Sequence, residues 1–327
     1  MEFDIIRLTN GLRVLHFEDK NIMTVHCGFI INAGSRDELS TENGIAHLIE
    51  HCLFKGTERR KAFHILTRLD SVGGEVNAYT TKEETSIYAS ALKEHFNRAA
   101  ELLVDITFSS IFPEKEIEKE KSVIIDEINS YKDNPDEMLM DEFEERLFPD
   151  HALGRSILGT ADLVNGFTRE DILRFVERNY STDQIVFTCV GNVSLKKIEA
   201  FCNNVLEKLP TSTSNRTNRT IPESTMFRES KKTSVHQVHS LLGCKTIGFD
   251  DDRRRAMVLM NNILGGPALN SRLNLNIRER FGYCYYIESS YAPYADTGVF
   301  QIYFGTDKRH ERKVAKLIVK ELKSLTD

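Results

Sequence analysis

Two histidines and a glutamate stand together in a strongly apolar stretch: His47, Glu50 and His51 lie within GIAHLIEHCLF. On a helix each residue advances by about 100°, so the three side chains fall on one arc. Two histidines one helical turn apart can share a zinc ion, and a nearby carboxylate can take a proton from a water molecule. An ordinary buried helix with satisfied histidines is the alternative, but a buried carboxylate is costly without a partner.

A catalytic zinc site needs a third protein ligand, and a second stretch offers one. Residues 114–132 have a helical pattern in which spaced isoleucines define an apolar face. Glu120 and Glu127 fall on that face and are expected to point toward the core. We predict Glu127 as the third metal ligand. Glu120 is assigned to the catalytic set as a residue that orients a ligand; a surface glutamate is the alternative interpretation for both.

The composition excludes several classes of protein. The 327 residues are 40% hydrophobic and 28% charged, which is typical of a globular protein. A net charge of −6 without a basic stripe argues against nucleic acid as a partner. No apolar run is long enough to span a bilayer, and the first residues do not resemble a secretory signal. The six cysteines form no CxxC pair, which favours free thiols and a cytoplasmic location.

The hydrophobic pattern predicts an alternation of strands and helices. Strands are expected at 13–17, 24–31, 75–92 (a pair around a turn at 81–83) and 183–191; helices are expected at 43–55, 61–71, 93–107, 114–132, 138–147, 168–179 and 194–208. After the polar stretch 211–220 the order begins again. This second part has a strand at 235–249, helices at 252–264 and 268–281, strands at 283–290 and 297–304, and a helix from 307.

This recurrence predicts an α+β fold of two tandem repeats, each a mixed β-sheet covered by helices. The predicted domains are an N-terminal zinc-binding repeat at 1–210, a linker at 211–224 and a second repeat at 225–327. The second repeat is shorter than the first, and we expect it to be truncated.

The motif and its flanks resemble the inverted-motif zinc peptidases of the pitrilysin, insulinase and mitochondrial processing peptidase family. His47-x-x-Glu50-His51 is similar to the H-x-x-E-H motif of these enzymes, and Glu127 to their later ligand. Other similar stretches are FKGT (54–57), GEVNAYT (74–80), the helix at 113–129, LGRSILG (153–159), and LGG followed by SRL (264–273).

The resemblance implies a zinc-dependent metalloendopeptidase that hydrolyses peptides or unfolded segments. One zinc ion per chain would be held by His47, His51 and Glu127, with Glu50 as the general base. A substrate could pair with the strand at Asn77, Ala78 and Tyr79 as an added edge strand. The resemblance also implies that Arg278 and Tyr285 bind the substrate. Their alternative interpretation is a surface cation and a strand aromatic.

The resemblance also implies a dimer, either of two copies or with a related subunit, with Arg278 and Tyr285 completing the partner's zinc site. Two other functions stay open: a non-catalytic partner or scaffold subunit of a processing-peptidase-like heterodimer, and a structural metal site without hydrolysis. The intact motif weighs against the first. The second would need a fourth side-chain ligand, and none is obviously placed for it.

Overall fold

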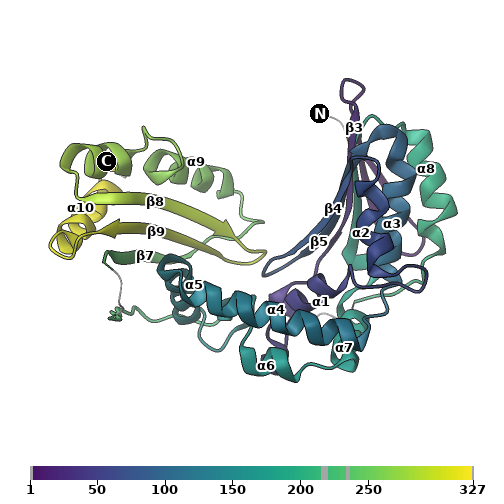
Figure 1. Cartoon of the computed structure of the whole chain (residues 1–327). Coiled ribbons are helices and arrows are strands. Elements are labelled where there is room, and N and C mark those ends of the chain that lie inside the picture. Colours follow the sequence, from purple (N-terminus) through teal and green to yellow (C-terminus); the bar gives the residue numbers. More distant parts are fainter. Residues whose placement is uncertain (1–2, 215–219, 233–235, 326–327) are drawn as a thin grey trace. The chain divides into compact units, whose positions relative to one another are not determined.

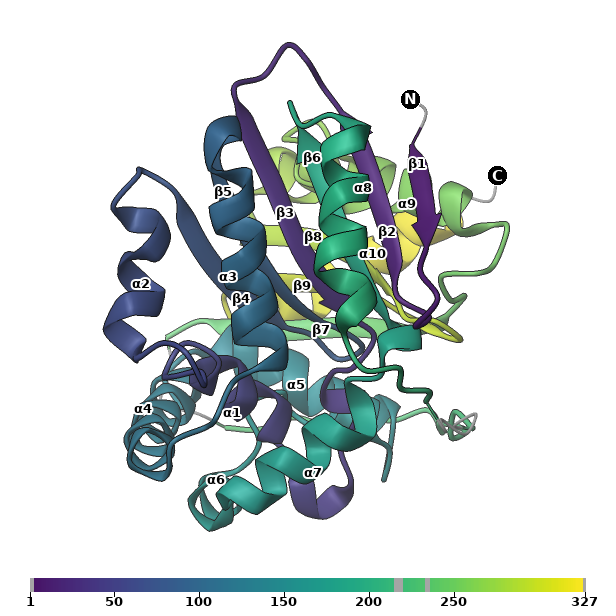
Figure 2. The ribbon, with the colours of Figure 1, turned by 90° about the vertical axis from the view of Figure 1, so that its right-hand side faces the viewer.

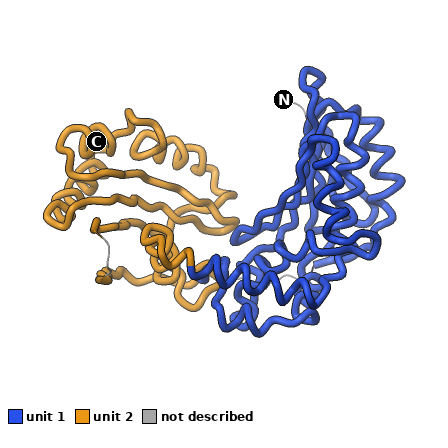
Figure 3. Tube along the Cα trace, viewed as in Figure 1, with its two compact units in different colours: residues 1–129, 155–218 blue, residues 130–154, 219–327 orange. Residues whose placement is uncertain are grey.

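The computed structural model describes residues 3–214, 220–232 and 236–325. Contacts divide the chain into two compact units (Figure 3). The first comprises residues 1–129 and 155–218, and the second comprises residues 130–154 and 219–327. Each unit is described by itself.

The first unit contains a six-stranded sheet (Figure 1). Its strands are β1 (Asp4–Arg7), β2 (Arg13–Glu18), β3 (Thr24–Ile31), β4 (Glu75–Thr80), β5 (Thr85–Leu92) and β6 (Ile185–Gly191). Its helices are α1 (Ile45–Cys52), α2 (Ala62–Asp70), α3 (Phe96–Phe108), most of α4 (Glu114–Lys132), α6 (Ala161–Gly166), α7 (Arg169–Asn179) and α8 (Leu195–Asn204). Short 3-10 turns lie at 35–37, 40–42, 93–95, 182–184 and 206–208.

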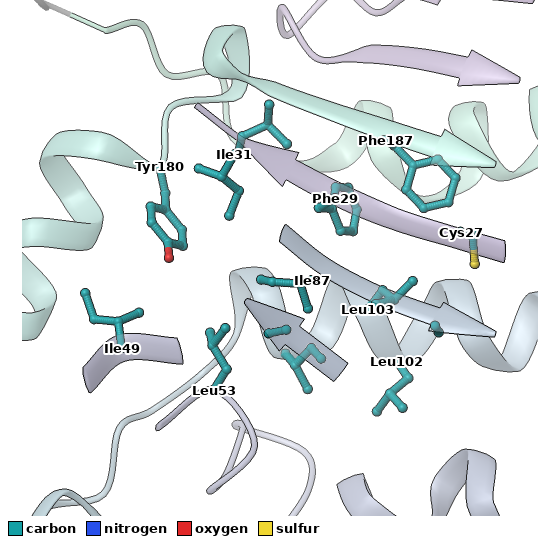
Figure 4. Packing of buried hydrophobic residues seen from close by; sticks show 14 of the residues in the cluster. Cys27, Phe29, Ile31, Ile49, Leu53, Ile87, Leu102, Leu103, Tyr180 and Phe187 are labelled. Atoms are coloured by element: carbon teal, nitrogen blue, oxygen red, sulfur yellow. The ribbon is translucent and has the colours of Figure 1, made fainter. Parts of the chain in front are cut away.

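The strand order is β1-β2-β6-β3-β5-β4, with β2 and β6 parallel and the other neighbours antiparallel. The central strand β3 is rich in β-branched and aromatic residues and is mostly buried. Figure 2 shows α3 and α8 side by side over one face of this sheet. Phe29 of β3 packs with Phe187 of β6 at a ring-centroid distance of 5.0 Å (Figure 4). This core fixes the sheet, whose edge strand β4 contacts α1.

The second unit has a three-stranded antiparallel sheet in the order β7-β9-β8. Its elements are α5 (Pro135–Leu147), a 3-10 turn at 152–154, β7 (Val238–Thr246), α9 (Arg254–Gly265), a π-helix (Asn274–Glu279), β8 (Cys284–Pro293), β9 (Gly298–Thr306) and α10 (Glu311–Lys323). Ile287, Phe304 and Val314 belong to a buried cluster that includes residues of both strands and of α10. A second cluster places Phe143 of α5 with Val299 of β9, which explains why residues 130–154 group with this unit.

The structure confirms the α+β prediction. In the first unit the elements follow the chain order β3, α1, α2, β4, β5, α3, and the strands lie in the sheet in the order β3-β5-β4. In the second unit the chain order is β7, α9, π-helix, β8, β9, α10, and the strands lie in the corresponding order β7-β9-β8. The repeat is therefore visible in strand pairing as well as in element order.

Some local predictions differ from the structure. Strand β1 and helix α6 were not predicted, because each is short and lacks a clear period. The helix expected at 268–281 contains the π-helix Asn274–Glu279, a winding that hydrophobic periodicity does not distinguish. The start of the strand expected at 235–249 and the middle of the expected linker, 215–219, lie outside the described residues. The domain boundaries at 210 and 225 concern the sequence repeat and stay a prediction.

Candidate metal centre

Helix α1 carries both histidines and is buried along most of its length. Its apolar residues pack into the core of the first unit, and His47 is only 8% exposed. Glu50 and His51 are half-buried. The helix has just eight residues, so packing and contacts at its ends, rather than helix propensity, must hold it in place.

Helix α4 brings two glutamates to α1. Ile117, Ile124 and Ile128 form its buried face, as the pattern predicts. Glu120 is also buried, but the side chain of Glu127 is 45% exposed. The expectation that Glu127 points into the core is therefore wrong. Hydrophobic periodicity predicts the direction in which a side chain leaves the helix. It does not predict how deeply that side chain is buried, and Glu127 is partly exposed to solvent.

The three predicted metal ligands converge. The Nε2 atoms of His47 and His51 each lie 3.8 Å from Oε2 of Glu127. The two imidazole rings are 4.7 Å apart and nearly perpendicular. Among the described residues, one ligand atom from each of the three lies within 4.8 Å of the others, a group that could hold a metal ion. Ligand atoms around tetrahedral zinc are about 3.4 Å apart, so the observed spacing fits zinc after small movements.

His47 is electrostatically suited to bind a metal. Burial, and next the neighbouring His51, lower its pKa to about 4. The imidazole is therefore neutral at physiological pH, and a nitrogen lone pair is available without loss of a proton. Its Nδ1 is buried and has no hydrogen-bond partner among the described residues. Packing in α1, rather than a hydrogen bond, sets the orientation of this ring.

His51 is oriented by Glu120. Oε2 of Glu120 lies 3.1 Å from Nδ1 of His51, and Oε1 lies 2.7 Å from Nζ of Lys55. A carboxylate at Nδ1 favours the tautomer that leaves Nε2 free for a metal. Glu120 thus acts through His51 and is a positioning residue. Lys55 was not singled out from the sequence, although a lysine directly after an apolar helix could have suggested a partly buried cation.

Glu50 lies beside the three ligands without joining them. Burial raises its pKa, and the negative charge of Glu127 raises it further, whereas the neighbouring Thr80 and His51 lower it. The carboxylate of Glu50 therefore belongs to the same electrostatic site as His51 and Glu127. Thr80 ends β4 and was not among the predicted site residues, since only contact across the fold relates it to Glu50.

Comparison with known proteins identifies the family of this chain. Residues 13–161 match the family model described as insulinase (peptidase family M16), and residues 166–327 match the peptidase M16 inactive domain. The uncharacterized zinc protease YmxG of Bacillus subtilis is 34% identical over 97% of this chain and 76% of its own. The chain belongs to the insulinase family, M16. An uncharacterized zinc protease of Rickettsia felis is also 34% identical, over 98% of this chain and 77% of its own.

Solved structures share the fold of this M16 chain. A peptidase M16 inactive domain from Pseudomonas fluorescens superposes with a TM-score of 0.90 at 22% identity, covering 99% of this chain and 79% of that one. A protease from Helicobacter pylori gives a TM-score of 0.86 at 23% identity, covering 98% and 79%. None of the helices in the described parts of the chain is long and apolar enough to cross a membrane.

The predicted substrate-binding residues lie in both units. Asn77, Ala78 and Tyr79 belong to β4, which pairs with β5 and, within the described residues, with no strand on its other side. Arg278 and Tyr285 belong to the second unit. Arg278 lies in the π-helix, and Tyr285, 60% exposed, lies where the β8–β9 register shifts. Bulges and π-helices often redirect functional side chains, but the roles of all five residues stay predictions.

We expect substitution of any single ligand to remove zinc from the protein. His47→Ala, His51→Ala and Glu127→Gln should each reduce the zinc content, measured by elemental analysis after dialysis, from about one ion per chain to near zero. Glu50→Gln and the control His64→Ala, an exposed histidine of α2, should retain the metal. Full zinc content in Glu127→Gln would exclude this residue as a ligand.

We also expect Lys55 to affect the metal through Glu120. Lys55→Met removes the cation that holds the Glu120 carboxylate beside His51, and residues that support ligands typically change metal affinity by about tenfold or more. The dissociation constant for zinc, measured by competition with a chromophoric chelator, should rise accordingly. Lys61→Met, at an exposed lysine, is the matched control. Equal affinities in both variants would contradict the role of Lys55.

Proposed function

We propose that this protein is a zinc-dependent metalloendopeptidase that hydrolyses peptides or unfolded protein segments. The observation that carries the proposal is the meeting of His47, His51 and Glu127, with Glu50 beside them and outside the ligand group. Two imidazoles and one carboxylate leave one position of a tetrahedral ion open, as in catalytic zinc sites. The relatives named zinc proteases support the choice of metal.

Glu50 is proposed as the general base. Bound zinc would polarise the scissile carbonyl and lower the pKa of a water molecule. The Glu50 carboxylate accepts a proton from that water and then donates a proton to the leaving amine. Burial and the charge of Glu127 raise its pKa above that of an exposed glutamate when no ion is bound. Thr80 lies close enough to lower this pKa, which places the carboxylate near the end of β4.

Strand β4 is the proposed peptide-binding edge. Because its outer edge carries backbone groups that pair with no described strand, an extended peptide can add beside Asn77, Ala78 and Tyr79. Main-chain pairing selects extended and unfolded segments and tolerates many sequences. Arg278 and Tyr285 are proposed, from the family resemblance, to bind the carbonyl region of the substrate or to stabilise the developing oxyanion.

The second repeat is proposed to contribute no metal ligand. Helix α9 occupies the place of α1 in the repeat, but residues 257–264 read MVLMNNIL and lack histidine and glutamate. This accords with the description of the matching family model as an inactive domain. A non-catalytic subunit is the less supported alternative, because the ligand group of the first unit is complete. A dimer in a reducing, cytoplasmic compartment is proposed on the sequence alone.

Activity should depend on Glu50 and on the metal separately. We expect Glu50→Gln to lower kcat for a quenched fluorescent peptide by about 10²- to 10⁴-fold, because the general base is lost while the zinc ligands remain. A chelator should abolish activity of the unmodified protein, and added zinc should restore it. Glu94→Gln, an exposed site in the 3-10 turn before α3, serves as the control. Zinc-loaded protein that cleaves no member of a broad peptide library would refute the proposal.

A dimer whose sites are completed by the partner predicts complementation. Glu50→Gln and Arg278→Ala chains, each weakly active alone, should regain activity after mixing and subunit exchange. In a random mixture half of the dimers are mixed and each holds one intact site, so about one quarter of the unmodified activity should return. Activity that stays at the level of the separate variants would show that Arg278 does not act across a dimer.

A further inference from the structure

The helix that carries the histidines has no N-terminal cap of its own. Its N-cap residue is Gly44, which has a left-handed φ of +99° and no side chain to accept hydrogen bonds. Instead, the carboxylate of Glu38 accepts hydrogen bonds from two main-chain N–H groups at the start of the helix. Oε2 lies 3.1 Å from the nitrogen of Gly44, and Oε1 lies 3.0 Å from that of Ala46. Glu38 is 3% exposed, so these bonds are shielded from water.

The surroundings of Glu38 hold its carboxylate in place. Asn43 donates to Oε2 at 3.0 Å and, through the same amide group, to the carbonyl of Ser156 at 2.8 Å. Burial raises the pKa of Glu38 to about 7, whereas the hydrogen bonds from Asn43, Ala46 and Gly44 and the charge of Arg155 lower it. Ionising this carboxyl therefore costs stability, and its position at the positive end of a helix offsets part of that cost.

The loop that contains Arg155 also contacts Glu38. The Arg155 guanidinium donates to the main-chain carbonyl of Glu38 at 2.6 Å, and Nζ of Lys82 donates to the carbonyl of Arg155 at 2.6 Å. A Cβ added to Gly159 would stand 2.3 Å from the carbonyl oxygen of Asn43, so the two segments touch through their main chains. Lys82 lies in the turn that joins β4 to β5. Thus α1 is connected to the proposed peptide-binding strand as well.

The position of α1 sets the distance between the two imidazoles and Glu127. His47 lies in the first turn of the helix and His51 in its last, over a length of about 12 Å. A rotation or a slide of this short helix would move both ligands together. A contact that fixes the first turn of α1 therefore fixes the positions of both histidines relative to Glu127.

We propose that Glu38 is a positioning residue: together with Asn43 and Arg155 it forms a buried clasp that holds α1 in its zinc-binding position before the metal arrives. The inference rests on the proposed zinc site. It assigns to the clasp a role in preorganisation, since a site already formed loses less conformational entropy when the ion binds.

The test compares two glutamates that lie close together in the sequence. Glu38→Gln retains the size of the side chain but turns one acceptor oxygen into a donor that faces N–H groups. We expect it to weaken zinc binding by about tenfold or more, as measured by chelator competition on folded, zinc-free protein. Glu42→Gln is the matched control, because the carboxylate of Glu42 accepts hydrogen bonds from Leu39 and Arg178 and, among the described residues, from no N–H group of α1. It should lower the unfolding temperature without changing zinc affinity.

A second measurement uses the unmodified protein without zinc. Amide hydrogen exchange at residues 46–48 should be slow, and faster in Glu38→Gln than in Glu42→Gln. A dissociation constant for Glu38→Gln within twofold of the unmodified value would overturn the proposal. Exchange at 46–48 as fast as in exposed loops of the unmodified protein would overturn it too, even if Glu38→Gln does not fold. Absence of any zinc binding by the unmodified protein would instead refute the proposed function.

Discussion

The Glu120 carboxylate joins the two helices on which the candidate metal centre depends. It lies on α4, the helix that supplies Glu127, and bonds to His51 on α1 and to Lys55 just after α1. Each of its oxygens has a defined partner, so the pair of helices has one preferred alignment. Removal of Lys55 or Glu120 would leave a largely desolvated charge without its counterion, which is far more costly than loss of an exposed ion pair.

Negative charge explains why a cation belongs at this place. The charge of Glu127 disfavours ionisation of Glu50, and the neighbouring His47 is neutral. A divalent ion between the imidazoles and Glu127 would relieve the repulsion between the carboxylates. The same ion would favour the ionised form of Glu50, the form that the proposed general base requires. The fold thus holds groups together whose mutual interactions are unfavourable until a cation binds.

The sequence predicts the candidate metal ligands and Glu50 better than it predicts the residues that hold them in place. His47, Glu50, His51 and Glu127 follow from residue type and helical spacing, and the strand order follows from a repeated pattern. Glu38, Lys55 and Thr80 act through contacts between segments far apart in the chain, which periodicity does not report. The partial exposure of Glu127 was missed for a related reason, since a helical arc gives direction and not the depth of packing. Local irregularities, such as the π-helix, leave the hydrophobic pattern unchanged.

The two repeats show how one topology carries different chemistry. Strands β3, β5 and β4 pair as β7, β9 and β8 do, yet only α1 combines two histidines with a carboxylate bound at its first turn. The second repeat deviates from regular geometry instead, with a π-helix at Arg278 and a shift of the β8–β9 register at Tyr285. Both deviations place a polar side chain outside the regular pattern of its element. The common fold therefore accounts for the sheets, and the residues with proposed roles lie where each copy departs from it.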